Sequence, residues 1–328
     1  MTMAAGETIG VILLNLGGPE KQEDVEPFLY NLFSDRQIIR LGPKFLQKPI
    51  ARLIARRRAR KSSKNYALIG GGSPLNRITA EQGRALAAEL ASAGSFRVSM
   101  AMRYWRPFAK ETLDEFARAG IRKIVGLTLY PHYSKATTGS SMVDLRRVMA
   151  DFSPGFELVE IASWPDQPDY IQCLAQTIQQ GLDTFGDDDV QLVYSAHSLP
   201  VKFIDEGDPY LEEMDKTIKG IEEITGRSGK LCFQSRSGPV EWLSPSTPDM
   251  LERLSKEGCK RVLMVPISFV SDHVETLYEI DIEYGELARK LGLELKRTES
   301  LNVLPQFILG LKNLVVEACR EKGWLMPN

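Results

Sequence analysis

Cysteine and histidine are scarce in this sequence of 328 residues, and neither sign of charge is in large excess. The four cysteines are scattered without a CxxC pair, which argues against a disulfide framework or a zinc knuckle. A net charge of −2 excludes the strongly basic footprint of a nucleic-acid-binding domain. No apolar run approaches the roughly eighteen residues of a spanning helix, and no basic, apolar leader opens the chain. We therefore expect a cytoplasmic globular protein that does not bind nucleic acid.

Strand-like apolar runs alternate with amphipathic helical stretches, which predicts an α/β fold with mostly parallel sheets. The expected strands are Val11–Leu16, Phe96–Met102, Lys123–Leu129, Val190–Tyr194, Lys230–Phe233 and Arg261–Phe269, with a helix over Lys110–Ala119. Proline and glycine at 153–155 and Trp164-Pro165 punctuate the middle of the chain. We predict two domains, residues 1–160 and 161–328. Residues 120–132 and 258–269 resemble each other, which two similarly wound domains would explain and shared α/β patterning would explain equally.

All three histidines follow an expected strand directly: His132, His197 and His273. Open α/β sheets bind ligands in the crevice beyond the carboxyl ends of their strands. His197 lies in a short turn closed by Pro200, where a neutral imidazole with an ordinary pKa of about 6.5 can accept protons. A histidine that only hydrogen-bonds to nearby backbone would fit the same position. We expect a site in a cleft between the two domains.

Acidic residues recur after His273 at helical spacing. Glu275, Glu279 and Glu283 lie four residues apart and share one helix face, with Asp272 one turn earlier. Like charges at this spacing repel by about 0.2–0.5 kcal/mol per pair on an exposed helix. A line of acids that starts at a strand's end therefore indicates a place where a cation or protons are handled. A solvated acidic face remains the alternative.

Three further segments suit an acidic, aromatic ligand. Residues 44–64 contain many Lys and Arg, no acid, and interleaved apolar residues, as in segments that lie on anionic membranes or line sites for acidic ligands. Arg103-Tyr104-Trp105 closes a strand with a cation and two rings. The hydroxyl-rich loop 130–141 leads toward a helix N-terminus, which favours an anion or simply a helix cap. The glycines at 70–72 lack the spacing and the lysine of a nucleotide loop.

Together these segments resemble the ferrochelatases, which insert ferrous iron into a porphyrin. The shared motifs are Leu14-Asn-Leu-Gly-Gly-Pro19, Gly70-Gly-Gly-Ser-Pro74, Ala101-Met-Arg-Tyr104, Tyr130-Pro-His-Tyr-Ser134, Thr137-Thr-Gly-Ser-Ser141, Ser195-Ala-His-Ser-Leu-Pro200, Gly207-Asp-Pro-Tyr210, Gln234-Ser-Arg and Ser271-Asp-His-Val-Glu275. Their order and spacing cover almost the whole chain. The resemblance implies two Rossmann-like domains with parallel four-stranded sheets and a porphyrin cleft between them, the type II chelatase fold.

The resemblance also implies residue roles. His197 matches the essential histidine and Glu275 the acid opposite it, both catalytic. The implied metal ligands are His197, Glu275, Glu279 and Glu283. His273 and Asp272 match the pair beside Glu275. Six residues match porphyrin contacts or the pocket wall: Arg58, Ser73, Arg103, Tyr104, Trp242 and Phe269. The segment 44–64 matches a pocket lip that faces the bilayer in membrane-associated members.

One departure concerns cofactors. Some members bind a [2Fe–2S] cluster through one mid-chain cysteine and three in a C-terminal extension. Cys173 stands at the mid-chain position, but no cysteine-rich tail follows, and Cys319 lies too early to replace it. We expect no cluster and no tightly bound cofactor, with Fe²⁺ as a substrate.

The implied activity is insertion of Fe²⁺ into protoporphyrin IX with loss of two pyrrole protons. Two alternatives stay open: a coproporphyrin III ferrochelatase, and a non-catalytic carrier of haem or porphyrin. The apolar residues beside arginines in the lip favour a porphyrin with two propionates and a greasy edge. A carrier has no use for a line of acids leading away from the ring.

Overall fold

The computed structural model describes residues 7–186 and 189–326 of the chain. They form two compact units: one holds the residues up to Trp164 together with the segment from Asn302 onward, and the other holds Pro165–Leu301. The segment from Asn302 thus groups with the first unit, whereas the predicted second domain runs from 161 to the end of the chain. Among the described residues, no helix has the length and apolar character needed to span a membrane.

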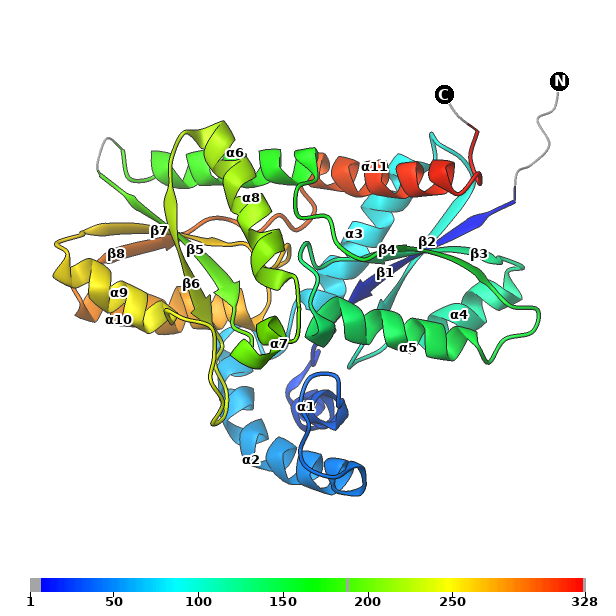
Figure 1. Cartoon of the computed structure of the whole chain (residues 1–328), viewed down its shortest axis with the longest axis horizontal. Helices are drawn as coiled ribbons and strands as arrows, with labels where there is room; N and C mark the ends of the chain where they lie inside the picture. The colour runs from blue at the N-terminus through cyan, green and yellow to red at the C-terminus, as the bar shows by residue number, and fades with distance from the viewer. Residues whose placement is uncertain (1–6, 187–188, 327–328) are drawn as a thin grey trace. The chain divides into compact units, whose positions relative to one another are not determined.

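The first unit is built on a parallel sheet of four strands in the order β2-β1-β3-β4 (Figure 1). Its strands are β1 Ile9–Asn15, β2 Phe96–Met102, β3 Lys123–Thr128 and β4 Glu157–Ile161. Its helices are α1 Val25–Ser34, α2 Gln47–Leu68, α3 Leu75–Leu90, α4 Ala109–Arg118, α5 Ser140–Met149 and α11 Pro305–Glu321, with short 3-10 turns η1 Gln22–Asp24 and η2 Lys44–Leu46 and a π-helix η3 Lys135–Gly139. All seven residues of β1 are buried, as expected for a central parallel strand.

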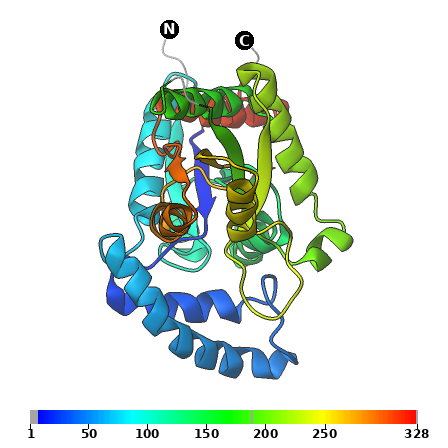
Figure 2. The same cartoon turned by 90° about the vertical axis from the view of Figure 1, so that its left-hand side faces the viewer.

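Helices cover both faces of this sheet. α3 packs on β1 and β2, and α11 packs on α3, β3 and β4. The amphipathic helices α4 and α5 bury their apolar sides against the other face, where Ile12, Phe116 and Leu145 are fully buried. α1 and α2 lie against each other as a helical pair, which Figure 2 shows in dark and light blue.

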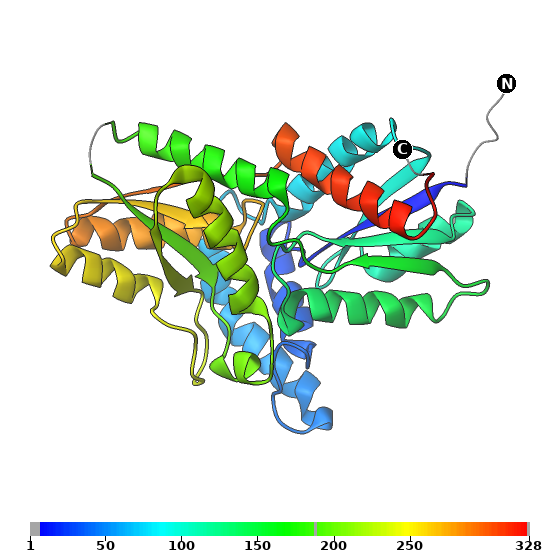
Figure 3. The same cartoon turned by 45° about the horizontal axis from the view of Figure 1, so that its top comes forward.

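The second unit repeats the same strand order, β6-β5-β7-β8, with all strands parallel (Figure 3). Its strands are β5 Gln191–His197, β6 Gly229–Gln234, β7 Arg261–Pro266 and β8 Glu294–Arg297. Its helices are α6 Pro168–Asp183, α7 Val201–Asp205, α8 Tyr210–Thr225, α9 Thr247–Lys256 and α10 Gly285–Lys290, with a ten-residue π-helix η4 Glu275–Tyr284. A reciprocal cap between Ser246 and Asp249 starts α9, because each side chain bonds to the other's backbone N–H.

The two units share their winding. In each, the third strand lies beside the first, and a π-helix follows the third strand after a loop. The resembling stretches 120–132 and 258–269 contain these equivalent strands, β3 and β7. A sheet in which the first strand lies between the second and the third has its switch point between the first and third strands, where ligands bind in open α/β sheets. In the second unit this point is the carboxyl end of β5 and β7.

Candidate active site

His197 and Glu275 meet at the carboxyl end of β5. Nδ1 of His197 lies 2.9 Å from Oε2 of Glu275. The backbone of His197 is fixed on both sides, because its N–H donates to Ser268 and its carbonyl accepts from the Tyr210 hydroxyl. A carboxylate only accepts hydrogen bonds, so the proton of the neutral ring lies on Nδ1. Nε2 of His197 therefore carries the lone pair that can accept a proton.

The electrostatics of this pair favour its charged form. Burial opposes charge on the imidazole, but Glu275 outweighs that effect and raises the pKa of His197. Burial likewise opposes charge on Glu275, but His197 and then His273 outweigh it and lower the pKa of this carboxyl. The His197 side chain is still 34 % exposed, against 17 % for Glu275. A proton can therefore reach the imidazole while the carboxylate stays ionised beneath it.

His273 and Phe269 complete the surroundings of Glu275. Nε2 of His273 lies 3.5 Å from Oε2 of Glu275, and its Nδ1 lies 3.0 Å from the carbonyl of Ser271. The ring of Phe269 packs edge-on against both imidazoles, with centroids 4.1 Å from His273 and 6.1 Å from His197. Phe269 therefore fixes the two ring planes beside the carboxylate.

Glu279, the next acid along η4, is bound by residues at the end of β6. The Ser235 hydroxyl and the Gln234 amide both donate to its Oε2, at 2.5 and 3.1 Å. Ser235 has a left-handed backbone with φ of 66°, which is costly for a non-glycine residue and recurs at functional sites. Burial and then the nearby charge of Glu275 raise the pKa of Glu279 to about 7. Glu279 can thus exchange a proton near neutral pH.

Gln234 and Ser195 were not assigned a role from the sequence. Gln234 pairs with His197 in the register of β5 and β6, and its amide also donates to the carbonyl of Glu275 at 3.0 Å. The Ser195 hydroxyl donates to the amide oxygen of Gln234 at 2.6 Å, which orients its NH₂ group toward the acids. The motif Gln234-Ser-Arg was the sequence signal that could have pointed to Gln234. The residues that Gln234 contacts depend on strand register, which the motif does not contain.

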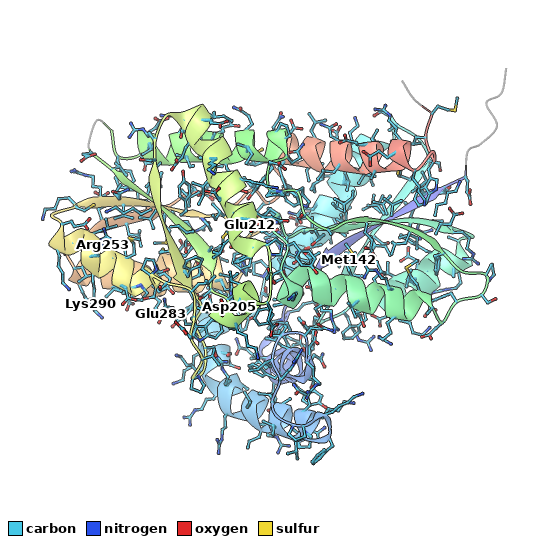
Figure 4. The ribbon with its side chains drawn as sticks, in the orientation of Figure 1. Met142, Asp205, Glu212, Arg253, Glu283 and Lys290 are labelled. Carbon is cyan, nitrogen blue, oxygen red and sulfur yellow. The ribbon has the colours of Figure 1, made fainter. Side chains whose placement is uncertain are left out.

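The acids run from interior to surface along η4. Glu275 and Glu279 are partly buried, whereas Glu283 is exposed (Figure 4). Asp272 turns to a different set of partners, Ser300, Thr276 and Arg297, rather than to Glu275. Within residues 7–186 and 189–326, no three His, Cys, Asp or Glu side chains converge closely enough to hold a metal ion. The four expected metal ligands are therefore arranged as a line and not as one coordination sphere.

Trp242 lies beside the turn that follows His197. Residues 241–243 pair with 199–201 through an isolated bridge between Pro200 and Trp242, with backbone bonds on either side. The indole N–H lies 3.4 Å from the carbonyl of Gly238. The structure thus brings Trp242 and Phe269 into the same unit as the His197–Glu275 pair.

In the first unit, Arg103 and Tyr104 are joined by a residue that sequence reasoning missed. Asp35 accepts from the Arg103 guanidinium at 2.8 Å, the Tyr104 hydroxyl at 2.7 Å and the Ser140 hydroxyl at 2.5 Å. Although burial opposes it, these donors, Ser140 first, lower the pKa of Asp35. Tyr104 is only 1 % exposed, so its ring is part of a buried network rather than an open ligand surface.

Arg103 also borders a cavity of about 340 Å³. The cavity is lined by Tyr30, Asn31, Ser34, Lys48, Arg103, Tyr104, Phe108, Lys110, Asp144, Arg147 and Val148. Its size lies at the lower end of the range for ligand pockets, about 300–1,000 Å³. A cavity of this size, lined by lysine and arginine side chains, suits one carboxylate group of a ligand better than a whole macrocycle.

The remaining predicted residues of this unit lie on other elements. Ser73 begins the turn into α3, where its N–H donates to the carbonyl of Pro19 at 2.7 Å and its hydroxyl accepts from Leu75. Arg58 is exposed on α2, with its guanidinium 5.4 Å from the ring centroid of Phe33. His132, at the end of β3, is 2 % exposed, and burial lowers its pKa to about 3. His132 therefore stays neutral at physiological pH.

The sequence and the fold are similar to those of known proteins. The Ferrochelatase family model matches residues 8–319. The ferrochelatase of Desulfotalea psychrophila is 58 % identical, covering 94 % of this chain and 97 % of its own, and that of Geotalea uraniireducens is 52 % identical with the same coverage. Among solved structures, SirB from Bacillus subtilis with Fe3+ superposes with a TM-score of 0.57 at 11 % identity, over 98 % of this chain and 100 % of that one.

The fold is that of the type II chelatases, as two parallel four-stranded sheets and the likeness to SirB indicate. The match to the family model and the identity to its curated members are far more specific than the fold. The chain belongs to the ferrochelatase family.

Proposed function

We propose that this protein inserts Fe²⁺ into protoporphyrin IX and that His197 accepts the pyrrole protons. The observation that carries the proposal is the contact between Nδ1 of His197 and Glu275. Insertion replaces two pyrrole N–H protons by one divalent cation, so a base must act next to the ring. General bases of this kind contribute about 10²–10⁴-fold to rate.

In this mechanism Nε2 of His197 takes a proton from a pyrrole nitrogen, and the imidazolium is stabilised by the carboxylate of Glu275 on its other side. Glu279, with a pKa of about 7, accepts protons further along η4. The exposed carboxylate of Glu283 passes them to solvent. Two protons leave for each Fe²⁺ that enters, so charge is conserved. His273 and Phe269 keep the pair aligned, and Glu275 and Glu279 offer the oxygen ligands that suit Fe²⁺ in transit.

We propose that the porphyrin contacts are those that the family resemblance implies. Trp242 and Phe269 offer ring surfaces, while Arg58 and Arg103 offer cations for the propionates. Ser73 is a further hydroxyl donor. Protoporphyrin IX is preferred to coproporphyrin III because α2 presents apolar side chains among its arginines. Exposed apolar residues of this region are Phe45, Leu46, Leu53 and Leu68. The two additional propionates of coproporphyrin III would be placed against those apolar side chains. A faster rate on coproporphyrin III would reverse this choice.

His197→Ala tests the catalytic role. The assay follows zinc-porphyrin fluorescence under multiple turnover, with protein at catalytic concentration, and porphyrin binding is measured separately by fluorescence quenching. We expect turnover to fall about 10²-fold or more while binding survives. Asp205→Ala, an exposed change on the nearby helix α7, serves as the control and should behave as wild type.

Turnover of His197→Ala near the wild-type rate would refute the role of His197. A wild-type signal that stops at one equivalent would instead indicate a porphyrin carrier.

We also infer peripheral contact of residues 44–64, in η2 and α2, with the inner face of the membrane in a cytoplasmic protein. Phe45 is 77 % exposed and Leu53 51 % exposed on a segment rich in Lys and Arg, a combination that binds anionic lipid surfaces. Sedimentation with anionic vesicles should therefore exceed that with neutral ones, and Phe45→Ser with Leu53→Ser should reduce it. Equal sedimentation with both vesicle types would count against this contact.

For cofactors, we infer that none is tightly bound. Cys173, Cys232 and Cys319 are buried, and burial raises the pKa of each thiol to about 11, which disfavours the thiolate needed for iron–sulfur ligation. Protein purified without oxygen should show no iron–sulfur charge-transfer bands. Stoichiometric iron and sulfide would contradict this inference.

A further inference from the structure

Arg297, at the end of β8, connects two carboxylates that lie on either side of the proposed catalytic acids. Its Nε and one terminal nitrogen bond to both oxygens of Asp281, at 2.8 and 3.0 Å. Its other terminal nitrogen lies 3.3 Å from Asp272. The Arg297 side chain is 9 % exposed. A planar guanidinium is suited to this geometry because it presents several donors in a fixed fork.

The contacts around Asp272 close this group into a network. The Ser300 hydroxyl donates to Asp272 at 2.7 Å and accepts from Arg297 at 3.2 Å. The Thr276 hydroxyl lies 3.3 Å from the same oxygen of Asp272. Burial opposes charge on Arg297, but Asp281 and then Asp272 outweigh it and raise its pKa. The arginine thus remains a cation shared by two anions.

The two aspartates flank the acids of the proposed mechanism along the chain. Asp272 directly precedes His273, and Asp281 follows Glu279 by two residues, so the segment between them contains both Glu275 and Glu279. Both ends of this segment are therefore tied to β8 through one side chain. His197 comes from a different strand, and its contact with Glu275 depends on where this segment is held.

Part of this segment has an unusual helical form. η4 is a π-helix over ten residues, whereas π-helices are rare and mostly limited to single turns. Because η4 begins at Glu275, Asp272 lies in the loop before the π-helix and Asp281 lies within it. Arg297 therefore joins the loop that leads into the π-helix to the helix itself.

We propose that Arg297 is a positioning residue for metal insertion: by joining Asp272 to Asp281 it holds the π-helix at the register that brings Glu275 against Nδ1 of His197. The proposal rests on the roles given above to His197 and Glu275. Arg297 acts through these residues and does not itself contact the porphyrin or the metal. Because Arg297 holds the segment that contains the reacting acids and not the porphyrin wall, it governs the rate of the bound complex.

Arg297→Lys tests the proposal, since it keeps the charge and removes the fork. We expect kcat for zinc insertion to fall about tenfold or more, since small misplacements of catalytic groups have effects of up to about 10². The KM for porphyrin should stay within about twofold, because the porphyrin contacts are untouched. Arg297→Met should lose more than Arg297→Lys. Arg253→Lys is the matched control, since Arg253 lies on α9 with its side chain 63 % exposed and pairs with Glu257 just after that helix.

Asp281→Asn separates positioning from folding. Asp281 is 37 % exposed, so this change removes half of the tie with little effect on the core. We expect the same fall in kcat at unchanged KM, with a thermal midpoint close to wild type. A lowered midpoint with wild-type kcat, or a rise in KM alone, would overturn the proposal and leave Arg297 a stabilising or binding residue. If Arg297→Met does not fold, Asp281→Asn decides.

The same assay on His197→Ala keeps the two hypotheses apart. If His197→Ala is inactive while Arg297→Lys and Asp281→Asn turn over at the wild-type rate, only the positioning role is refuted. Active His197→Ala refutes the proposed catalytic base, whatever Arg297 does.

Discussion

We predict that the charge of Asp35 contributes strongly to the stability of the first unit. It is 7 % exposed and joins four donors: Arg103, Tyr104 and Ser140 through one oxygen, and the backbone N–H of Gln37 through the other, at 2.8 Å. The change Asp35→Asn keeps the shape of the side chain and removes its charge. Arg103, which is 21 % exposed, then loses its close partner.

Removing one member of a buried ion pair costs about 3–5 kcal/mol. The lower end applies here, because Arg103 is partly solvated and Asp144 remains at 3.9 Å. For a unit of this size, each kcal/mol shifts the melting temperature by about 2–4 °C, so we expect a fall of about 6–12 °C. Differential scanning calorimetry or circular dichroism at neutral pH measures it. Asp114→Asn is the control: its pair with Lys110 is exposed, and such pairs contribute about 0–1 kcal/mol.

The pH dependence gives a second check with a definite sign. The pKa of Asp35 is lower in the folded protein than its ordinary value of 3.8. Its contribution to stability is therefore complete above that ordinary value and is lost as pH falls through the folded pKa. The difference between wild type and Asp35→Asn should shrink in acid. A melting temperature for Asp35→Asn within the range of the Asp114→Asn control, or a difference that grows in acid, would refute the reasoning.

Two further predictions concern Glu279 and Gly72. The pKa of Glu279 is raised to about 7 in the folded protein, so wild-type stability is lost as the pH rises from the ordinary value of 4.5 through 7. Glu279→Gln should therefore be more stable than wild type at pH above about 7, and it should lose the neutral limb of the pH–rate profile. An unchanged profile would count against a proton relay through this acid. A Cβ on Gly72 would lie 2.2 Å from the backbone carbonyl of Glu20, so Gly72→Ala should displace the turn that carries Ser73 and weaken porphyrin binding; Gly155→Ala, which meets nothing within 4 Å, is the control, and equal binding by the two variants would show that the turn adapts.

Strong local patterns were readable from the sequence. Six strands were predicted, and all six are present, with Phe96–Met102 agreeing in both bounds. β4 and β8 were missed. Both are edge strands, and their residues, Glu157–Ile161 and Glu294–Arg297, are mostly charged or only partly buried. Charge on edge strands is common because it discourages pairing with other chains, and it hides the apolar run that reveals a central strand.

The C-terminal helix shows what periodicity leaves undecided. α11 is amphipathic and buries one face. The same pattern fits a helix on either sheet, and the structure packs α11 on α3, β3 and β4 of the first unit. The π-helix is a similar case. A spacing of four between Glu275, Glu279 and Glu283 places them on one side of either helix type, so the wider form was not apparent before its hydrogen bonds were known.

The candidate site, too, was predictable from the sequence only in part. His197, Glu275 and the acids behind them were identified from residue type, spacing and a family resemblance. The partners that decide how they act were not: Gln234 and Ser235 on Glu279, Arg297 on Asp272, and Asp35 on Arg103 and Tyr104. Each of these contacts joins residues from separate elements, and short-range patterns carry no information about which elements will be neighbours.

By itself the sequence determined the alternation of strands and helices, the chemistry at the strand ends and the family, because burial and charge are written locally along each element. Only the tertiary structure decided which ring nitrogen of His197 meets a carboxylate, that Glu279 is held by Ser235, and that Tyr104 is closed inside a network with Asp35. The physical reason is that these outcomes depend on strand order and register, which bring together groups that lie up to 78 residues apart in the second unit and 105 in the first.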